Sequence, residues 1–166
     1  MADVKANYPA ASDVTITLAS LASDTNLLTG RESTAVDNSS NLYLDYLISG
    51  KITTGTSPTT AKSIQVWAVG SWDGTTWPDV FDGTDSAETI TTANHKNSVC
   101  RFLVEMATDA TSNQTYHFGP VSVASAFGGV MPKSFVVFVT HNTAVNLNST
   151  AGNHQIRIQP YYETVT

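Results

Sequence analysis

The side chains in this sequence that are best suited to acid–base or nucleophilic chemistry are four histidines and one cysteine. The histidines fall in predicted loops and at predicted strand ends, without Glu-x-x-His or His-x-x-x-His spacing; they are His95, His117, His141 and His154. A catalytic triad assembles in space, so sequence spacing alone leaves that chemistry open. There is no G-x-S-x-G elbow, and Cys100 beside Val99 and Phe102 indicates a buried, inert thiol. We therefore expect no enzyme and no catalytic residues.

Carboxylates gather in a polar loop that we predict between Pro78 and Ser98. Four of them fall close together, namely Asp79, Asp82, Asp85 and Glu88. Oxygen ligands suit Ca²⁺, but intervals of three differ from the alternating spacing of an EF-hand loop. The pattern favours a solvated acidic loop, so we predict neither a metal ion nor another cofactor.

Two tryptophans flank an Asp-Gly pair, which is typical of a tight turn at the end of a strand. An indole ring can stack on a pyranose, and jelly rolls host many sugar-binding proteins. Aromatic residues at hairpin ends also cap a core or fill an interface, and this second role is the more common one. The sequence therefore favours a core or interface role for Trp72 and Trp77, and surface recognition of a sugar by these two candidates is the alternative.

The elements that must position these residues are strands. Apolar and polar residues alternate with period two in most of the chain, which indicates half-buried strands. We predict them at 14–18, 42–54, 99–107, 114–118, 133–140 and 154–163, with another beginning at Lys62. About eight strands predict an all-β, single-domain antiparallel sandwich of jelly-roll type.

One short helix is expected from Pro120 to Phe127, because proline favours the first helical position and glycine the position past the end. Gly50 should interrupt its strand with a bulge. We divide the chain into a polar N-terminal arm, residues 1–13, which either is loose or reaches a neighbouring subunit, and a sandwich domain, residues 14–166.

Two of the predicted strands are apolar on both faces, so both of their faces need a cover. The side chains on the unexpected face are Trp67, Val69, Val136 and Phe138. Exposed together, they would form a patch of the size that marks an interaction site. We predict an interface with another copy or with a partner; the alternative is a cover made by the 120–127 helix and flanking loops.

The composition excludes several classes of protein. With 8 basic and 14 acidic residues, a formal net charge of −6 argues against binding to nucleic acid or to an anionic membrane. The single cysteine cannot form an intrachain disulfide. No apolar run approaches the ~20 residues that span a bilayer, and the N-terminus lacks the apolar stretch of a secretory signal. We expect synthesis in a cytoplasm.

Three segments together resemble a known family. They read LTGRESTAVDNSSNLYLDYLISGKITTGTSPT, VWAVGSWDGTTWPDVFDGTDSAET and FGPVSVASAFGGVMPKSFVVFVTHNTAVNLNSTAGNH. The pattern is similar to small virion structural proteins of tailed bacteriophages, of the capsid cement or head-decoration type, and covers residues 15–164. This resemblance implies a non-enzymatic virion protein that binds the major capsid protein on the outer head surface and stabilises the head, as a homo-oligomer, with a trimer favoured. The alternative is a tail or host-recognition module that binds cell-surface carbohydrate through Trp72 and Trp77.

Overall fold

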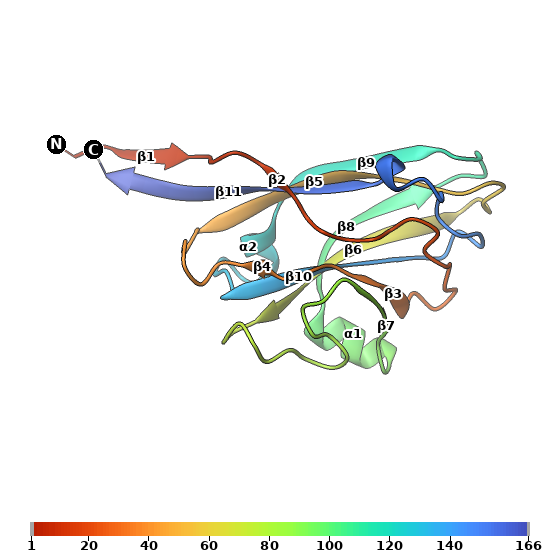
Figure 1. Ribbon diagram of the computed structural model, residues 1–166, viewed down its shortest axis with the longest axis horizontal. Coiled ribbons are helices and arrows are strands. Elements are labelled where there is room, and N and C mark those ends of the chain that lie inside the picture. Colours follow the sequence, from red (N-terminus) through yellow and green to blue (C-terminus); the bar gives the residue numbers. More distant parts are fainter. Residues whose placement is uncertain (1, 166) are drawn as a thin grey trace.

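The computed structural model describes residues 2–165, so Met1 and Thr166, the outermost residues of the predicted arm and domain, lie outside it. Two antiparallel sheets pack face to face (Figure 1). The first sheet contains β1 (Val4–Asn7), β11 (Gln155–Val165), β5 (Asp45–Thr53) and β9 (Thr115–Ser122), with β2 (Ser12–Asp13) also paired to β11. The second contains β7 (Ser86–Thr89), β3 (Thr29–Glu32), β10 (Ser134–His141), β6 (Lys62–Ser71) and β8 (Arg101–Thr108), with β4 (Val36–Asp37) also paired to β10.

The order of strands matches the predicted jelly roll. Its eight main strands in chain order are β2, β3, β5, β6, β8, β9, β10 and β11. On that count, one sheet pairs the first, eighth, third and sixth strands, and the other pairs the second, seventh, fourth and fifth. This is the arrangement of a jelly roll, in which two Greek keys form the two layers. The predicted all-β sandwich is therefore confirmed.

The main core lies between the sheets and follows the alternation in the sequence. Tyr46, Ile48 and Ile52 of β5 are buried against the second sheet. That sheet contributes the alternate residues of β6 and β10 that the sequence assigned to the inner face: Ile64, Val66, Ala68, Phe135, Val137 and Val139. We call this cluster the inner core. The register of β5 against β9 shifts between Ile48 and Gly50, so the predicted bulge is confirmed.

Residues 14–18 alternate as predicted but form no strand. Val14 and Leu18 are buried in the inner core, while Thr15 and Thr17 are exposed. Only one backbone hydrogen bond ties the start of this segment to the first sheet, from the Val14 amide to the Ile156 carbonyl. Burial alone therefore produced the period-two pattern.

The prediction of a single helix from Pro120 to Phe127 is wrong in two respects. Helix α2 is shorter, Val123–Ala126, because the Ser122 side chain caps it and Pro120 belongs to β9. Its predicted glycine ending is correct, since Gly128 and Gly129 both have positive φ. A second helix, α1 (Ala93–Val99), lies in the predicted polar loop and is capped by Thr92. A 3₁₀ turn, η1 (Ala151–Asn153), precedes β11.

The N-terminal segment belongs to the first sheet. Strand β1 pairs with the end of β11, from Val4 opposite Val165 to Asn7 opposite Tyr162, and β2 pairs with β11 further along. Together β1 and the end of β11 form a two-stranded ribbon that extends beyond the two layers (Figure 1). None of the helices within residues 2–165 is long and apolar enough to cross a bilayer.

Candidate functional site

The four residues predicted to form an interface lie on the outer face of the second sheet, where the same chain covers them. Val136 pairs with Val69, and Phe138 pairs with Trp67, across β10 and β6. Val69, Val136 and Phe138 are each 0% exposed. The interface prediction is wrong for these three residues, because their side chains are not accessible to a second subunit.

The cover is residues 72–100, which we call the cover segment. It contains β7, the edge strand of the second sheet, and its loops and α1 lie over the outer face of that sheet (Figure 1). Its apolar side chains pack on the four predicted residues and form the outer cluster. They are Phe81, Ile90 and Cys100, with Trp77, Val80 and Val99 partly buried beside them. The alternative cover that the sequence suggested, the helix at 120–127, packs instead against the inner core.

Glu32 holds the middle of the cover segment to the sheet. Its carboxylate is fully buried and accepts hydrogen bonds from the backbone amides of Gly83, at 2.7 Å, and Asp82, at 3.3 Å. Burial raises the pKa of Glu32 to about 7, against the opposite effect of these amides. A glutamate with such a pKa is found at catalytic sites, but here its oxygens are directed to the backbone of its own chain.

Two further sets of polar contacts hold the cover segment, at Asp85 and at Lys96. Arg31 Nε lies 2.6 Å from Asp85 Oδ1, and Thr17 donates to the same carboxylate. Lys96 of α1 is buried, and its Nζ donates to the Leu27 carbonyl at 2.6 Å and to Gln65 Oε1 at 3.0 Å. Burial lowers the pKa of Lys96 to about 8. Each charged group serves to hold this cover in place.

Trp67 is the one predicted interface residue that keeps partial exposure. Its ring packs edge-on against Phe102, with 5.1 Å between centroids, and Lys96 Nζ lies 4.5 Å from the ring centroid. Strict alternation along the predicted strand 99–107 places Phe102 on the inward face with Val104 and Met106, yet Phe102 is 49% exposed. The register of β6 against β8 shifts next to Trp67, so Leu103 fills the inner core and Phe102 is turned outward.

The acidic residues of the predicted loop are held separately. Asp79 accepts from Thr91, Asp82 from the Thr84 amide, and Glu88 from Ser86. Asp85 is engaged by Arg31 and Thr17. Within residues 2–165, no three His, Cys, Asp or Glu side chains are grouped closely enough to hold a metal ion. This loop is ordered by its own carboxylates.

The histidines and the cysteine are also dispersed. His141 is buried between Thr143 Oγ1 and the Leu21 carbonyl, and burial lowers its pKa to about 4. His154 contacts the Asn148 carbonyl, whereas His95 and His117 are exposed. Burial in the outer cluster raises the pKa of Cys100 to about 12, as expected for an unreactive thiol.

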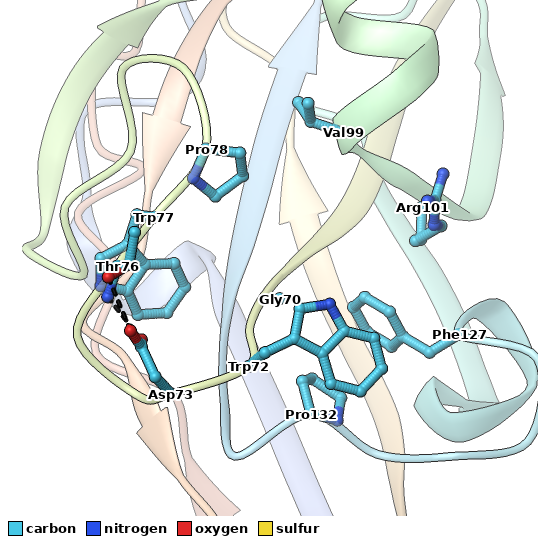
Figure 2. A pocket seen from close by; sticks show the side chains of 10 residues that line it. All are labelled: Gly70, Trp72, Asp73, Thr76, Trp77, Pro78, Val99, Arg101, Phe127 and Pro132. Carbon is cyan, nitrogen blue, oxygen red and sulfur yellow. Dashed lines mark hydrogen bonds between the residues drawn. The ribbon is translucent and has the colours of Figure 1, made fainter.

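The two candidate recognition residues do meet. Trp72 and Trp77 both line a hollow of about 550 Å³ where β6 leaves the second sheet (Figure 2). The other lining residues come from β6, from the turn and the loop after it, from the end of α1, from β8 and from the segment after α2: Gly70, Asp73, Thr76, Pro78, Val99, Arg101, Phe127 and Pro132. Trp72 is 70% exposed, while Trp77 also packs on the outer cluster. We call this site the aromatic hollow.

The turn between the tryptophans is fixed by one carboxylate. Asp73 Oδ1 accepts from the amides of Thr75 and Thr76 at 2.8 and 2.6 Å, and Oδ2 accepts from the Thr76 hydroxyl at 2.6 Å. These hydrogen bonds, led by that of the Thr76 side chain, lower the pKa of Asp73. Gly74 follows with φ of +84°, so the predicted Asp-Gly turn presents Trp72 on a rigid support.

A second exposed apolar surface lies on the ribbon, and the sequence patterns did not predict it. Val4 and Val165 are cross-strand neighbours, 64% and 71% exposed. Tyr8 follows β1 and packs against Tyr161, with ring centroids 5.4 Å apart. We call Val4, Tyr8 and Val165 the ribbon patch. Because β1 is the last strand of its sheet, its outer edge also offers unpaired backbone groups.

Comparisons with protein-family models, with curated proteins and with solved structures find no match for this chain. Its function is therefore inferred from its own residues and from the sequence resemblance.

Proposed function

We propose that this chain is a structural protein of a tailed-bacteriophage virion that binds the major capsid protein on the outer head surface and stabilises the head. The ribbon patch is the observation that carries the proposal. It places apolar side chains and an open strand edge together on a projection, and this combination suits docking against another protein. The resemblance of three long segments to head-decoration proteins supports the capsid as that partner.

The electrostatic character of the chain agrees with a protein partner. A net charge of −6 disfavours nucleic acid and anionic lipid, and charged residues make up only 13% of the sequence. Docking through a few apolar side chains would be weak for one copy. Many copies on a repeating lattice would be held firmly, because linked contacts raise the effective concentration of each.

Assembly as a trimer at local three-fold positions remains part of this proposal. Since the side chains of Val69, Val136 and Phe138 are covered, contacts between copies must use other surfaces. Leu42 and Leu44, exposed in the turn before β5, extend the apolar surface near the ribbon, because the Leu44 amide donates to the Tyr161 carbonyl.

The test compares phage heads that lack the protein with heads to which it is restored. A ligand that binds only the intact shell stabilises it by mass action, so restored heads should open at a higher temperature. The double variant V4D/V165D should fold, with an unchanged circular dichroism melt, and fail to load. The matched variant V130D changes a similarly exposed valine, 62% exposed and outside both ribbon strands, and should load normally.

Two results would count against the proposal. Equal opening temperatures with and without the protein would remove the stabilising role. A copy number of a few dozen per virion, measured by densitometry of purified particles, would place the chain in the tail, whereas hundreds of copies fit a head protein.

A further inference from the structure

The aromatic hollow has the size and composition of a small-molecule site and lies apart from the ribbon patch. Its volume of about 550 Å³ falls within the ~300–1,000 Å³ usual for ligand pockets, which are mostly apolar with a few placed polar groups. Trp72, Trp77, Phe127 and Pro132 are among its apolar lining residues. A tryptophan that is 70% exposed at the mouth of such a site is available for stacking.

The polar groups of the hollow stand at its opposite sides. Figure 2 shows Asp73 and Thr76 on one side of the Trp72 indole and Arg101 on the other. Asp73 Oδ2 accepts one hydrogen bond, from the Thr76 hydroxyl, and so has capacity for another. Arg101 has one hydrogen bond among the described residues, from Nη1 to the Ser98 carbonyl, which leaves other guanidinium donors.

This arrangement places an acceptor and a donor at the two ends of an apolar surface. One exposed carboxylate and one exposed guanidinium cancel, so the hollow carries no net charge to attract an ion. A compact, uncharged ligand suits this arrangement if it can both donate and accept at its edges and has an apolar face between them. A hexopyranose has this combination, since its axial C–H groups form the face and its hydroxyls form the edges.

We propose that the aromatic hollow binds a single neutral hexopyranose residue of a glycan. The ring stacks on Trp72, one hydroxyl donates to Asp73 Oδ2, and the guanidinium of Arg101 donates to a hydroxyl at the opposite edge. The site is pre-formed, because the hydrogen bonds of Asp73 hold the turn and Gly70 lets Phe127 and Pro132 lie close to the strand. A Cβ at Gly70 would come within 2.9 Å of the Phe127 ring.

This binding is separate from capsid docking and tests independently. The purified chain is titrated with the methyl glycosides of glucose, galactose, mannose, N-acetylglucosamine and N-acetylgalactosamine, followed by tryptophan fluorescence and by amide chemical shifts. We expect saturable binding of at least one glycoside, with shifts confined to the turn 72–77, to Arg101 and to Phe127. W72A should weaken that binding at least about tenfold, and R101M should weaken it less.

The control variant Y8A removes another exposed aromatic side chain, on the ribbon, and should bind the glycoside like the wild type. Trp72 is largely exposed, so W72A should keep its fold, and an unchanged melting temperature checks this. Absence of saturable binding for all five glycosides overturns the proposal. So does equal binding by W72A, or binding of a proline-rich peptide at the same residues without any sugar.

Discussion

The two apolar clusters of this molecule share strands β6 and β10 but are closed in different ways. The inner core is closed by a second sheet, and its side chains alternate along strands on both sides. The outer cluster is closed by the cover segment, a mostly irregular stretch with one short strand and one helix. Fully buried Glu32 and nearly buried Lys96 hold this cover in place through hydrogen bonds.

This difference shows what the sequence of a strand apolar on both faces can predict. It predicts that both faces are covered, but not whether the cover comes from the same chain or from another subunit. A second subunit and a segment of the same chain satisfy this prediction equally in sequence terms. Here the polar anchors decide the matter, because Glu32, Arg31 and Lys96 all bind groups of their own chain across the join. Such a closure should open more easily than the sheet-on-sheet core.

Substitution of one phenylalanine in each cluster gives the largest expected effects. Phe135 and Phe138 lie on the same strand, both 0% exposed, one in each cluster. F135A should lower the free energy of unfolding by about 3–5 kcal/mol. F138A should lower the free energy of unfolding by about 3 kcal/mol, near the lower end of that range, because the cover segment can relax into the space left by the ring. Denaturant melts of both variants measure the difference.

Hydrogen exchange separates the two sites further. F138A should speed amide exchange in residues 72–100 more than in the first sheet, since the outer cluster opens locally. F135A should speed exchange throughout. Uniform acceleration in both variants would show that the clusters unfold as one unit and that the cover segment has no independent opening.

Glu32 gives a smaller, pH-dependent effect. Its pKa in the folded chain, about 7, lies above the usual value for a glutamate, so the folded state binds more protons between about pH 4.5 and 7. The contribution of Glu32 to stability should therefore fall as pH rises through this window, by an amount on the order of 1–3 kcal/mol. E32Q should remove the fall, because an amide keeps an acceptor for Gly83 without titrating.

The measurement is the difference between wild type and E32Q in chemical denaturation at several pH values. The difference is needed because His141 has the opposite effect on stability. Its pKa in the folded chain is lowered to about 4, so its contribution to the free energy of unfolding falls as pH drops below about 6.5. E163Q, in strand β11 of the other sheet, is a matched control and should keep the fall. Parallel curves for wild type and E32Q would contradict a titrating Glu32.

The smallest effect concerns the single thiol. Cys100 is buried in the outer cluster, so a thiol reagent should label it only when the cover segment opens. Labelling of the native protein should be slow, faster in F138A, and nearly unchanged in V130D. Labelling with rates equal to those of global unfolding would mean that the outer cluster opens only when the whole chain does.

Much of the fold could be predicted because alternation in the sequence reflects burial on one face. The patterns around Ile48, Ile156 and Phe135 all gave strands that the structure contains. Helix α1 was not predicted because its residues have no apolar periodicity. Its one buried residue is Lys96. Its only sequence signal was Thr92, a capping residue that is common in loops as well.

The candidate site was predictable only in part. The Asp-Gly turn predicted that Trp72 and Trp77 lie near each other, and they do. Arg101 and Phe127 come from other parts of the chain and reach the hollow through strand pairing and the position of α2, which sequence spacing does not encode. Phe102 shows the same limit, because one bulge reversed the direction it was expected to face.

Strand β10 has a consequence for how the chain is made. All eight of its residues are buried, and it sits in the middle of the second sheet, yet it follows every other strand of that sheet in the sequence. During synthesis, β6 therefore has one edge unpaired until β10 has been made. Val66 and Val69 are then exposed on its two faces. Such a half-built sheet is prone to pair with other nascent chains. A pause in translation before Ser134, or many nascent chains close together, should therefore favour inclusion bodies over soluble protein.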